Sequence, residues 1–454
     1  MMWPSTRRLT IHSDDFMVDS DFPPMLEELH VRLLYASDIA RLKLPSSLRK
    51  LSIYCSNLVN FDGSTLRGGE DITHLSIKGN VESIDVSRFS RLISLAIESI
   101  FFEGASLTLG VTIIRQLESL TLTNIQFDGT LPGFIEGLPA LKTLRLAGKY
   151  QDGYPHMSIS SGELPRSLTH FFVEGVRIDR LDLSNLPNLA HVGLDKCLSQ
   201  PKLVRLPPSV THLSLRDNEF PTLPSDRMVL PPNLIWLDAT GTELEVPKSP
   251  LQVPLPFKGY PNLQYLAVSF GASQWSNQLL KIDTAACFPP SLLKFHIVAR
   301  YLDDFTLSAS SQLRDLTITG PGPRVGRVDL SQGRHLKRLR LQARVSFNIL
   351  SLRLPSELDE LSFDMPLEPG CEPFAIRRVF KATAALRKPW MLRTTLARIK
   401  PEELDLLPNT LNTVYDYGTQ RRMSAAEALQ GRSSSLGSYL TPITDWWWRT
   451  QYAT

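Results

Sequence analysis

One spacing of apolar residues recurs along most of the chain. Each copy has an apolar residue, two variable residues, a second apolar residue, one variable residue and a third apolar residue, as in Leu48, Leu51 and Ile53. Fifteen copies begin at Leu26, Leu48, Ile72, Leu92, Leu117, Leu141, Leu168, Leu189, Val210, Leu234, Leu263, Leu292, Leu313, Leu336 and Leu358. The mean period is about 24 residues, which indicates a stack of similar units rather than separate globular domains.

Each copy predicts one short strand. The second and third apolar residues are two positions apart, so they point to the same side of a strand. A single strand of this kind cannot bury its apolar side alone, whereas strands stacked side by side share a continuous core. Because every copy runs in the same direction, we expect one long parallel sheet.

The segments between the predicted strands have two recurrent patterns. Several copies are entered through Leu-Pro-x-x-Leu, as at 44–48 and 164–168, or through Pro-Pro, as before Val210. Proline lacks an N–H donor and fixes φ, so these entries favour extended rather than helical returns. Other copies have a second apolar run that ends six residues before the next strand unit, as Val86 precedes Leu92. This constant spacing indicates a real element on the opposite side of the solenoid.

These units resemble leucine-rich repeats. The proline-bearing copies are similar to the short repeats of bacterial effectors and to FNIP-type repeats, because 208–213 reads Pro-Ser-Val-Thr-His-Leu. The Ile-Asp-Val-Ser copies are similar to the internalin or SDS22-like type. The resemblance implies an α/β solenoid dominated by β-structure: a leucine-rich-repeat horseshoe with a parallel concave sheet and mostly non-helical convex returns. It also implies a ladder asparagine, which Asn80 and Asn218 supply, with Cys197 and Thr242 as substitutes.

The repeat pattern predicts four regions. Residues 1–366 form the solenoid of about 15–16 repeats, 367–403 a basic helical insertion or cap, and 404–417 a last atypical repeat. Residues 418–454 form a flexible tail that ends near three consecutive tryptophans. We interpret 375–400 as two short amphipathic helices divided by Pro389. The basic side chains of 375–400 have two alternative roles. They face solvent on a structural cap, or they contact an anionic partner. The candidate contacts are Arg377, Arg378, Lys381, Arg387, Lys388 and Arg393.

The predicted register places one residue of every strand in an outward row on the concave face. In the middle of this row stand His170, His191 and His212, followed by Trp236 and Tyr265. The same count predicts outward positions for two phenylalanines, so our candidate partner contacts are His170, Phe172, His191, His212, Trp236, Tyr265 and Phe270. Three aligned histidines also suggest a zinc site. We favour no metal, because Thr-His-Leu belongs to the repeat pattern itself, and we expect no cofactor.

Composition and cysteine usage restrict the cellular setting. The formal net charge is +3, which favours no particular class of partner. The four cysteines are far apart in the sequence, as expected in a reducing compartment. The N-terminus does not read as a signal peptide, and no apolar run reaches the ~18–20 residues of a membrane helix. We therefore expect a soluble protein of the cytoplasm, with the nucleus as an alternative.

The sequence favours a noncatalytic function. It contains no Gly-rich phosphate loop, no GxSxG and no HExxH. Our main prediction is a protein-interaction scaffold that binds a macromolecular partner on its concave face, with unknown oligomeric state. The alternative is docking to nucleic acid or an acidic membrane surface through 375–400. A remote alternative is an effector-type ubiquitin ligase, based on Cys371 followed by Glu372, although about 83 residues remain for such a domain.

Overall fold

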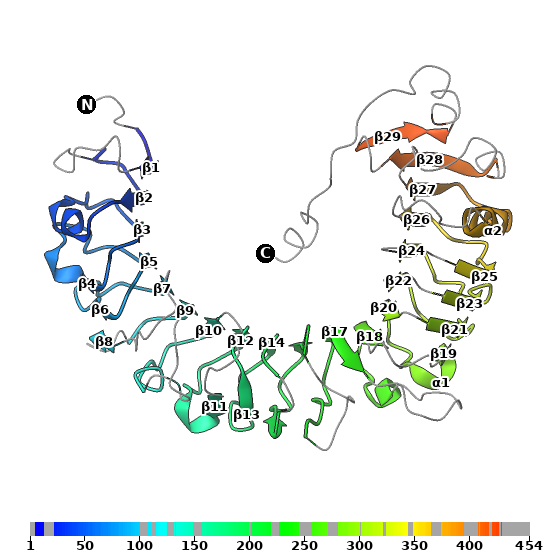
Figure 1. Cartoon of the computed structure of the whole chain (residues 1–454), viewed down its shortest axis with the longest axis horizontal. Coiled ribbons are helices and arrows are strands. Elements are labelled where there is room, and N and C mark those ends of the chain that lie inside the picture. Colours follow the sequence, from blue (N-terminus) through cyan, green and yellow to red (C-terminus); the bar gives the residue numbers. More distant parts are fainter. Residues whose placement is uncertain are drawn as a thin grey trace.

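The structure is a computed structural model of the whole chain. It describes residues 5–12, 22–99, 108–110, 115–124, 131, 133–148, 157–198, 201–218, 227–244, 256–270, 280–299, 301–320, 324–343, 348–364, 374–394, 407, 409–416, 420–425 and 428. The described elements form an open horseshoe with a continuous sheet on its inner side (Figure 1). This confirms the predicted β-dominated leucine-rich-repeat solenoid.

The inner, concave sheet has 19 strands, which follow one another in chain order and are parallel except for the last pair. The first ten are β1 (Arg8–His12), β2 (Glu28–Leu33), β3 (Lys50–Cys55), β5 (His74–Gly79), β7 (Ser94–Ser99), β9 (Ser119–Thr123), β10 (Thr143–Ala147), β12 (His170–Glu174), β14 (His191–Asp195) and β16 (His212–Ser214). The others are β17 (Trp236–Leu244), β18 (Tyr265–Phe270), β20 (Lys294–Ala299), β22 (Asp315–Gly320), β24 (Arg338–Ala343), β26 (Glu360–Asp364), β27 (Trp390–Thr394), β28 (Leu411–Asp416) and β29 (Arg421–Ser424).

Three short parallel sheets lie on the outer, convex side, and they account for the second apolar run of several repeats. They contain β4 (Asn60–Asp62), β6 (Ser83–Asp85) and β8 (Thr108–Gly110); β11 (Met157–Ser160), β13 (Ile178–Asp182) and β15 (Leu203–Arg205); and β19 (Leu280–Asp283), β21 (Tyr301–Thr306), β23 (Arg324–Asp329) and β25 (Asn348–Arg353). The described helices are short: η2 (Ala36–Arg41), η3 (Gly63–Thr65), η4 (Ser161–Glu163), η5 (Pro256–Gly259), α1 (Thr284–Cys287) and α2 (Phe374–Thr383). The prediction of mostly non-helical convex returns is therefore confirmed for the described residues.

The strand register matches the register predicted from the repeat. Lys50 pairs with His74, His191 with His212, and Tyr265 with Lys294. Each of these residues is the second after the first apolar residue of its repeat. Apolar residues therefore alternate with outward residues, and a one-residue slip would expose the whole apolar row.

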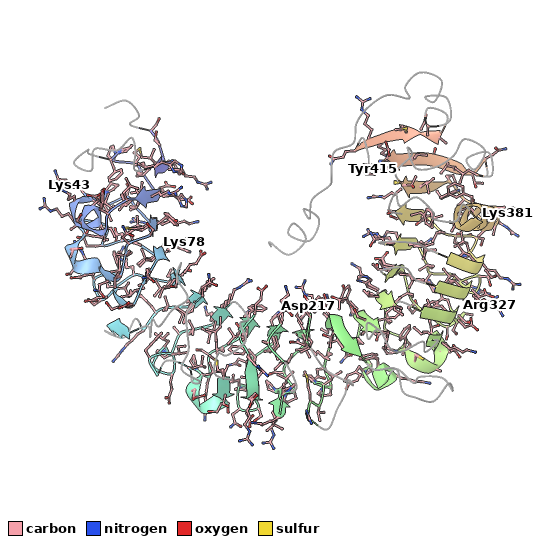
Figure 2. All side chains as sticks on the ribbon, viewed as in Figure 1. Lys43, Lys78, Asp217, Arg327, Lys381 and Tyr415 are labelled. Atoms are coloured by element: carbon pink, nitrogen blue, oxygen red, sulfur yellow. The ribbon has the colours of Figure 1, made fainter. Side chains whose placement is uncertain are left out.

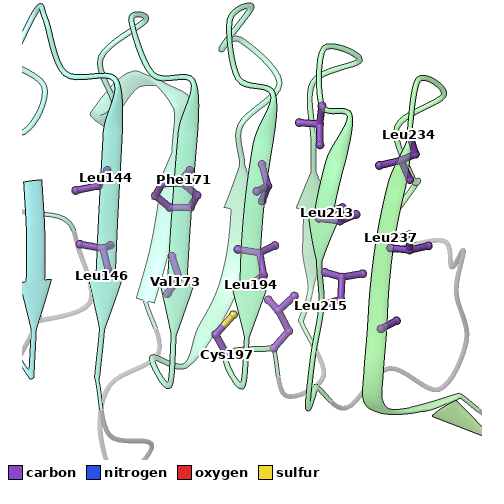
Figure 3. Packing of buried hydrophobic residues seen from close by; sticks show 14 of the residues in the cluster. Leu144, Leu146, Phe171, Val173, Leu194, Cys197, Leu213, Leu215, Leu234 and Leu237 are labelled. Atoms are coloured by element: carbon purple, nitrogen blue, oxygen red, sulfur yellow. The ribbon is translucent and has the colours of Figure 1, made fainter. Parts of the chain in front are cut away.

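The core is a single apolar strip between the concave sheet and the convex returns. Leu144, Phe171, Leu194, Leu213 and Leu237 come from successive repeats, point to the same side of the sheet and are fully buried (Figure 3). Each strand contributes such inward-pointing apolar residues to the core. These side chains shield the equivalent side chains of the neighbouring strands from water. Burial of a leucine side chain stabilises by ~1.5–3 kcal/mol, so the stack as a whole, rather than any one repeat, holds the fold.

A tight turn before the strand explains several of the proline-bearing entries. The N–H of Leu168 donates to the carbonyl of Pro165 at 3.2 Å, and Val210 makes the same bond to Pro207. A serine just before the strand closes the junction, because Ser167 Oγ donates to the carbonyl of Leu141 in the preceding repeat at 2.7 Å. The entries are therefore turns rather than the extended segments that we predicted, and their serine links one repeat to the next.

Asn218 acts as the predicted ladder asparagine. Its side-chain oxygen accepts from the N–H groups of Cys197 at 2.9 Å and Leu198 at 2.8 Å, while its amide donates to the carbonyl of Leu194. Asn218 is 3% exposed, so these backbone groups have no access to water. In the next repeat Thr242 takes over part of this role, since its hydroxyl donates to the carbonyl of Leu215.

The C-terminal part of the solenoid corrects our domain prediction. We expected a basic helical insertion or cap at 367–403 between the solenoid and a last repeat at 404–417. Instead, β27 lies between β26 and β28 and pairs in parallel with both. We expected a second helix after Pro389, and this is wrong. Trp390 and Leu392 are buried and alternate with partly exposed Met391 and Arg393, which is the pattern of a strand. Segment 374–394 is thus an additional repeat, with α2 as its convex return.

The region predicted as a flexible tail begins with a strand. β29 pairs antiparallel with β28 and forms the end of the concave sheet. Arg421 and Arg422 on β29 are exposed. Charged residues on an edge strand discourage pairing with further strands. The tryptophan-rich end at 446–448 lies outside the described residues.

Candidate functional site

Five aromatic side chains form a continuous stack on the concave face, which we call the aromatic ladder. They are His170, His191, His212, Trp236 and Tyr265, the first residues of β12, β14, β16, β17 and β18. Ring centroids lie 4.4 Å apart in the first two pairs, 6.5 Å between His212 and Trp236, and 5.1 Å between Trp236 and Tyr265. All interplanar angles are between 5° and 23°. The strand spacing of about 4.8 Å imposes this near-parallel stacking.

Threonine hydroxyls orient two of the histidines. Thr169 Oγ1 lies 2.8 Å from Nδ1 of His170, and Thr211 Oγ1 lies 2.9 Å from Nδ1 of His212. The same hydroxyls lie 3.1 and 3.3 Å from carbonyl oxygens of the preceding repeat. The Thr-His dipeptide therefore anchors each ring at its base. The sequence alone shows that Thr-His is part of the repeat pattern, but it does not show that the threonine holds the imidazole.

The three histidines favour the neutral state. Burial lowers the pKa of His170 and that of His212, and the imidazole of His170 lowers the pKa of His212 further. The effect is largest for His191, where burial and the imidazoles on both sides lower the pKa to about 4. A proton on any of these rings would lie against a second imidazole in a desolvated stack. At pH 7 the stack is uncharged.

Phe172 lies beside the aromatic ladder, as predicted. Its ring centroid is 6.2 Å from that of His170, and its ring covers Gly193 on the neighbouring strand. A Cβ atom at Gly193 would lie 2.7 Å from Cδ1 of Phe172, so only glycine leaves room for the ring in this position. No sequence pattern pointed to this contact, because the two residues are 21 positions apart.

Phe270 corrects the prediction. It is 6% exposed and belongs to the core, whereas Tyr265 on the same strand faces outward. The two residues are five positions apart, and an odd separation places side chains on opposite faces of a strand. Phe270 is therefore not a candidate contact.

Four carboxylates lie next to the aromatic ladder, and two of them flank the guanidinium of Arg216. Asp195 accepts from Ser214 Oγ and from the backbone N–H of Arg216 at 3.0 Å. Arg216 Nε lies 3.4 Å from Asp195 and 3.7 Å from Asp238. Burial raises the pKa of Asp195 and of Asp238, and hydrogen bonds to the ionised forms oppose this effect. The other two carboxylates have cations of their own: Glu174 lies 3.3 Å from Arg145, and Asp217, which Figure 2 shows on the inner side, lies 3.8 Å from Lys196.

The basic segment is partly neutralised by the last repeats. Lys388 pairs with Glu357, and Arg393 lies 3.0 Å from Glu360 with its guanidinium 5.5 Å from the Tyr415 ring centroid. Lys381 and Arg387 are exposed, and Figure 2 places Lys381 on the outer side of the horseshoe. The side chains of Arg377 and Arg378 lie outside the described part of the chain. The described cations are thus divided between salt bridges and separate surfaces, and do not form one patch.

The geometry does not favour a metal site. Stacked imidazoles point their nitrogens in parallel rather than toward one point, as zinc coordination requires. Within the described ranges, no cluster of three or more His, Cys, Asp or Glu side chains is arranged to hold a metal ion. Among the helices of those ranges, none has the length and apolar character needed to cross a membrane.

Comparisons with known proteins found similarity only to solved structures, and that similarity is low. No family model matches the sequence, and no curated protein matches it significantly. Similar solved structures include the circular leucine-rich-repeat protein CroV588, at 15% identity over 91% of this chain and 70% of that chain, with a TM-score of 0.42. The functional domain of InlJ from Listeria monocytogenes is 17% identical over 80% of this chain and 74% of that chain, with a TM-score of 0.37. YopM from Yersinia enterocolitica is 18% identical over 80% of this chain and 85% of that chain, with a TM-score of 0.35. At these scores the similarity supports no functional argument.

Proposed function

We propose that the protein is a noncatalytic interaction module that binds a protein partner on its concave face, with the aromatic ladder as the main contact. One observation carries this proposal: five aromatic rings from five consecutive repeats are stacked in one row, half-buried, at the centre of the inner surface. The inner faces of solenoids offer extended concave surfaces of the kind used for binding.

The two largest rings are the expected anchors. Trp236 and Tyr265 stack at 5.1 Å, and both belong to residue types that dominate interface energies. Neither ring contributes to the core on the other side of the sheet. Their loss should therefore weaken binding more than it weakens folding.

Quantitative affinity capture tests this proposal. Immobilised wild-type protein is compared with the double variant Trp236→Ala/Tyr265→Ala and with Tyr54→Ala as a matched control. Tyr54 is also a half-buried concave aromatic residue, but it contacts Arg32 and Lys78 far from the aromatic ladder. We expect proteins that bind wild type and the control but not the double variant. Each anchor should contribute about 2 kcal/mol to a purified partner's affinity, or about 30-fold in Kd. Identical capture by all three proteins would refute the proposal.

We also propose a reducing compartment, the cytoplasm or the nucleus. The described cysteines Cys55, Cys197 and Cys287 are all buried, as small apolar core residues would be. Fluorescence imaging of the tagged full chain tests this, and a secreted product would contradict it.

The anionic-partner alternative stays a prediction. Its best remaining candidates are the exposed Lys381 and Arg387, since Lys388 and Arg393 have acidic neighbours. Binding to RNA or anionic vesicles that weakens steeply with salt and is lost on Lys381→Glu/Arg387→Glu would support it.

A further inference from the structure

The way the rings stack decides which part of them a partner can reach. His191 lies between His170 and His212, with ring planes 5° and 20° from parallel and centroids 4.4 Å away on both sides. Both of its faces are therefore covered. A partner meets the edges of the three imidazoles, so their ring nitrogens, rather than their π-faces, define the chemistry of this part of the aromatic ladder.

The hydrogen bonds at the base of the stack assign the tautomer of two rings. The hydroxyl of Thr169 donates its single proton to the carbonyl of Lys142, so it accepts a hydrogen bond from Nδ1 of His170. Thr211 makes the same pair of contacts with Ala190 and His212. Nδ1 is then the protonated nitrogen in each ring. Nε2 on the opposite edge is an acceptor, because a neutral imidazole has one N–H.

The surrounding charges attract a cation. On β12 to β18 and the turns that follow them, four carboxylates, those of Glu174, Asp195, Asp217 and Asp238, outnumber two cations, Lys196 and Arg216. Arg216 lies against Asp195 and Asp238, whereas Glu174 pairs with Arg145 on the preceding strand β10. The outward positions of the described strands on either side have more cations than carboxylates, for example Lys50 and Lys78 in the N-terminal arm and Lys294, Arg338 and Arg340 in the C-terminal arm. The centre is thus the negative part of the concave face.

A flat apolar surface lies between the imidazole edges and the carboxylates. Phe172 stands between His170 and Glu174 on β12, and its ring lies over Gly193 on β14. The side chain of Glu174 is 48% exposed, so its carboxylate can turn toward a ligand, although it now lies 3.3 Å from Arg145. Planar guanidinium groups stack on aromatic rings and bind carboxylates through several N–H groups at once.

We propose that this part of the concave face receives an arginine side chain of the protein partner. Nε2 of His170 and of His212 accept its N–H groups, the ring of Phe172 packs against its plane, and Glu174 with Asp195 balances its charge. The inference rests on the proposed function, since it names the chemistry of the partner at the same surface. It is nevertheless independent of the anchor role of Trp236 and Tyr265.

Nitrogen NMR on protein labelled with ¹⁵N-histidine tests the assignment directly. The probes are acetylated and amidated pentapeptides Gly-Ser-X-Ser-Gly, in which X is Arg, Lys or Glu. We expect Nδ1–H tautomers for His170 and His212 in the free protein. The Arg peptide should shift their Nε2 resonances saturably, and the Glu peptide should not.

The chain offers a matched control. His74 on β5 has the same Thr-His arrangement, with its Nδ1 2.9 Å from Thr73 Oγ1, but it lies outside the negative centre. His212→Phe keeps a stacking ring and removes the acceptor, so it should weaken Arg-peptide binding about tenfold. His74→Phe should leave binding unchanged. Circular dichroism confirms that both variants are folded.

Three results would overturn the inference: Nε2–H tautomers in His170 and His212, equal responses to the Arg and Lys peptides, or no saturable response to the Arg peptide. The proposed function would survive any of these if a partner is still lost on Trp236→Ala/Tyr265→Ala. Conversely, Arg-peptide binding at the histidines without any partner captured through the anchors would support the arginine site and refute the anchor role.

Discussion

Replacement of Asn218 by alanine gives the most direct test of how the repeats are joined. The Asn218 side chain satisfies the N–H groups of Cys197 and Leu198 and the carbonyl of Leu194, all in a buried turn. Asn218→Ala leaves these three backbone groups without partners. An unsatisfied buried polar group costs ~1–3 kcal/mol, and water entering the small space left behind recovers part of this. We expect a loss of about 3–4 kcal/mol.

Urea unfolding followed by circular dichroism measures the global effect, and hydrogen exchange with mass spectrometry locates it. Exchange should increase in 191–218, because the backbone groups concerned lie there, and much less in distant repeats such as 315–343. Asn188→Ala is the matched control, since Asn188 makes one exposed bond to the carbonyl of Arg166 at 3.2 Å. If Asn218→Ala and Asn188→Ala lowered stability equally, or by less than about 1 kcal/mol, the assigned role of Asn218 would be refuted.

Two further predictions concern a turn and the response to acid. Gly241→Ala should destabilise by at least about 1–2 kcal/mol in thermal or urea unfolding, because Gly241 has φ of 73° and a Cβ atom would lie 1.8 Å from Asp217 Oδ1. Gly259→Ala, with no atom within 4 Å of the new Cβ, should be nearly neutral. Stability should also fall as the pH falls below 6.5, because burial, aided by Arg340, lowers the pKa of His296 from 6.5 to about 4, and the unfolded chain then binds the proton more tightly. At pH 5 this linkage amounts to about 2 kcal/mol, and His296→Gln should reduce the pH dependence between 7 and 5 by about that amount. An unchanged slope in His296→Gln would contradict the assignment.

Much of the site could be predicted because the repeat fixes the register. Once the apolar rows of successive strands align, His170, His191, His212, Trp236 and Tyr265 must occupy equivalent positions on neighbouring strands. The predictions failed at positions that the alignment of successive strands did not constrain. Phe270 is an odd number of residues from Tyr265 and therefore faces the core. The helix expected after Pro389 is a strand, because a partner strand was available on each side of 390–394.

Local sequence and tertiary structure therefore determined different properties. The 24-residue period, the alternation within each strand and the proline entries determined a parallel solenoid and its outward row, because burial of an apolar row leaves one register. Contacts between repeats decided the rest: the fit of Phe172 over Gly193, the bonds of Asn218 to an earlier turn, the neutral imidazole stack and the carboxylates gathered around Arg216. These depend on side chains about 20 residues apart, whose distance and solvent exposure are set only when the strands have stacked.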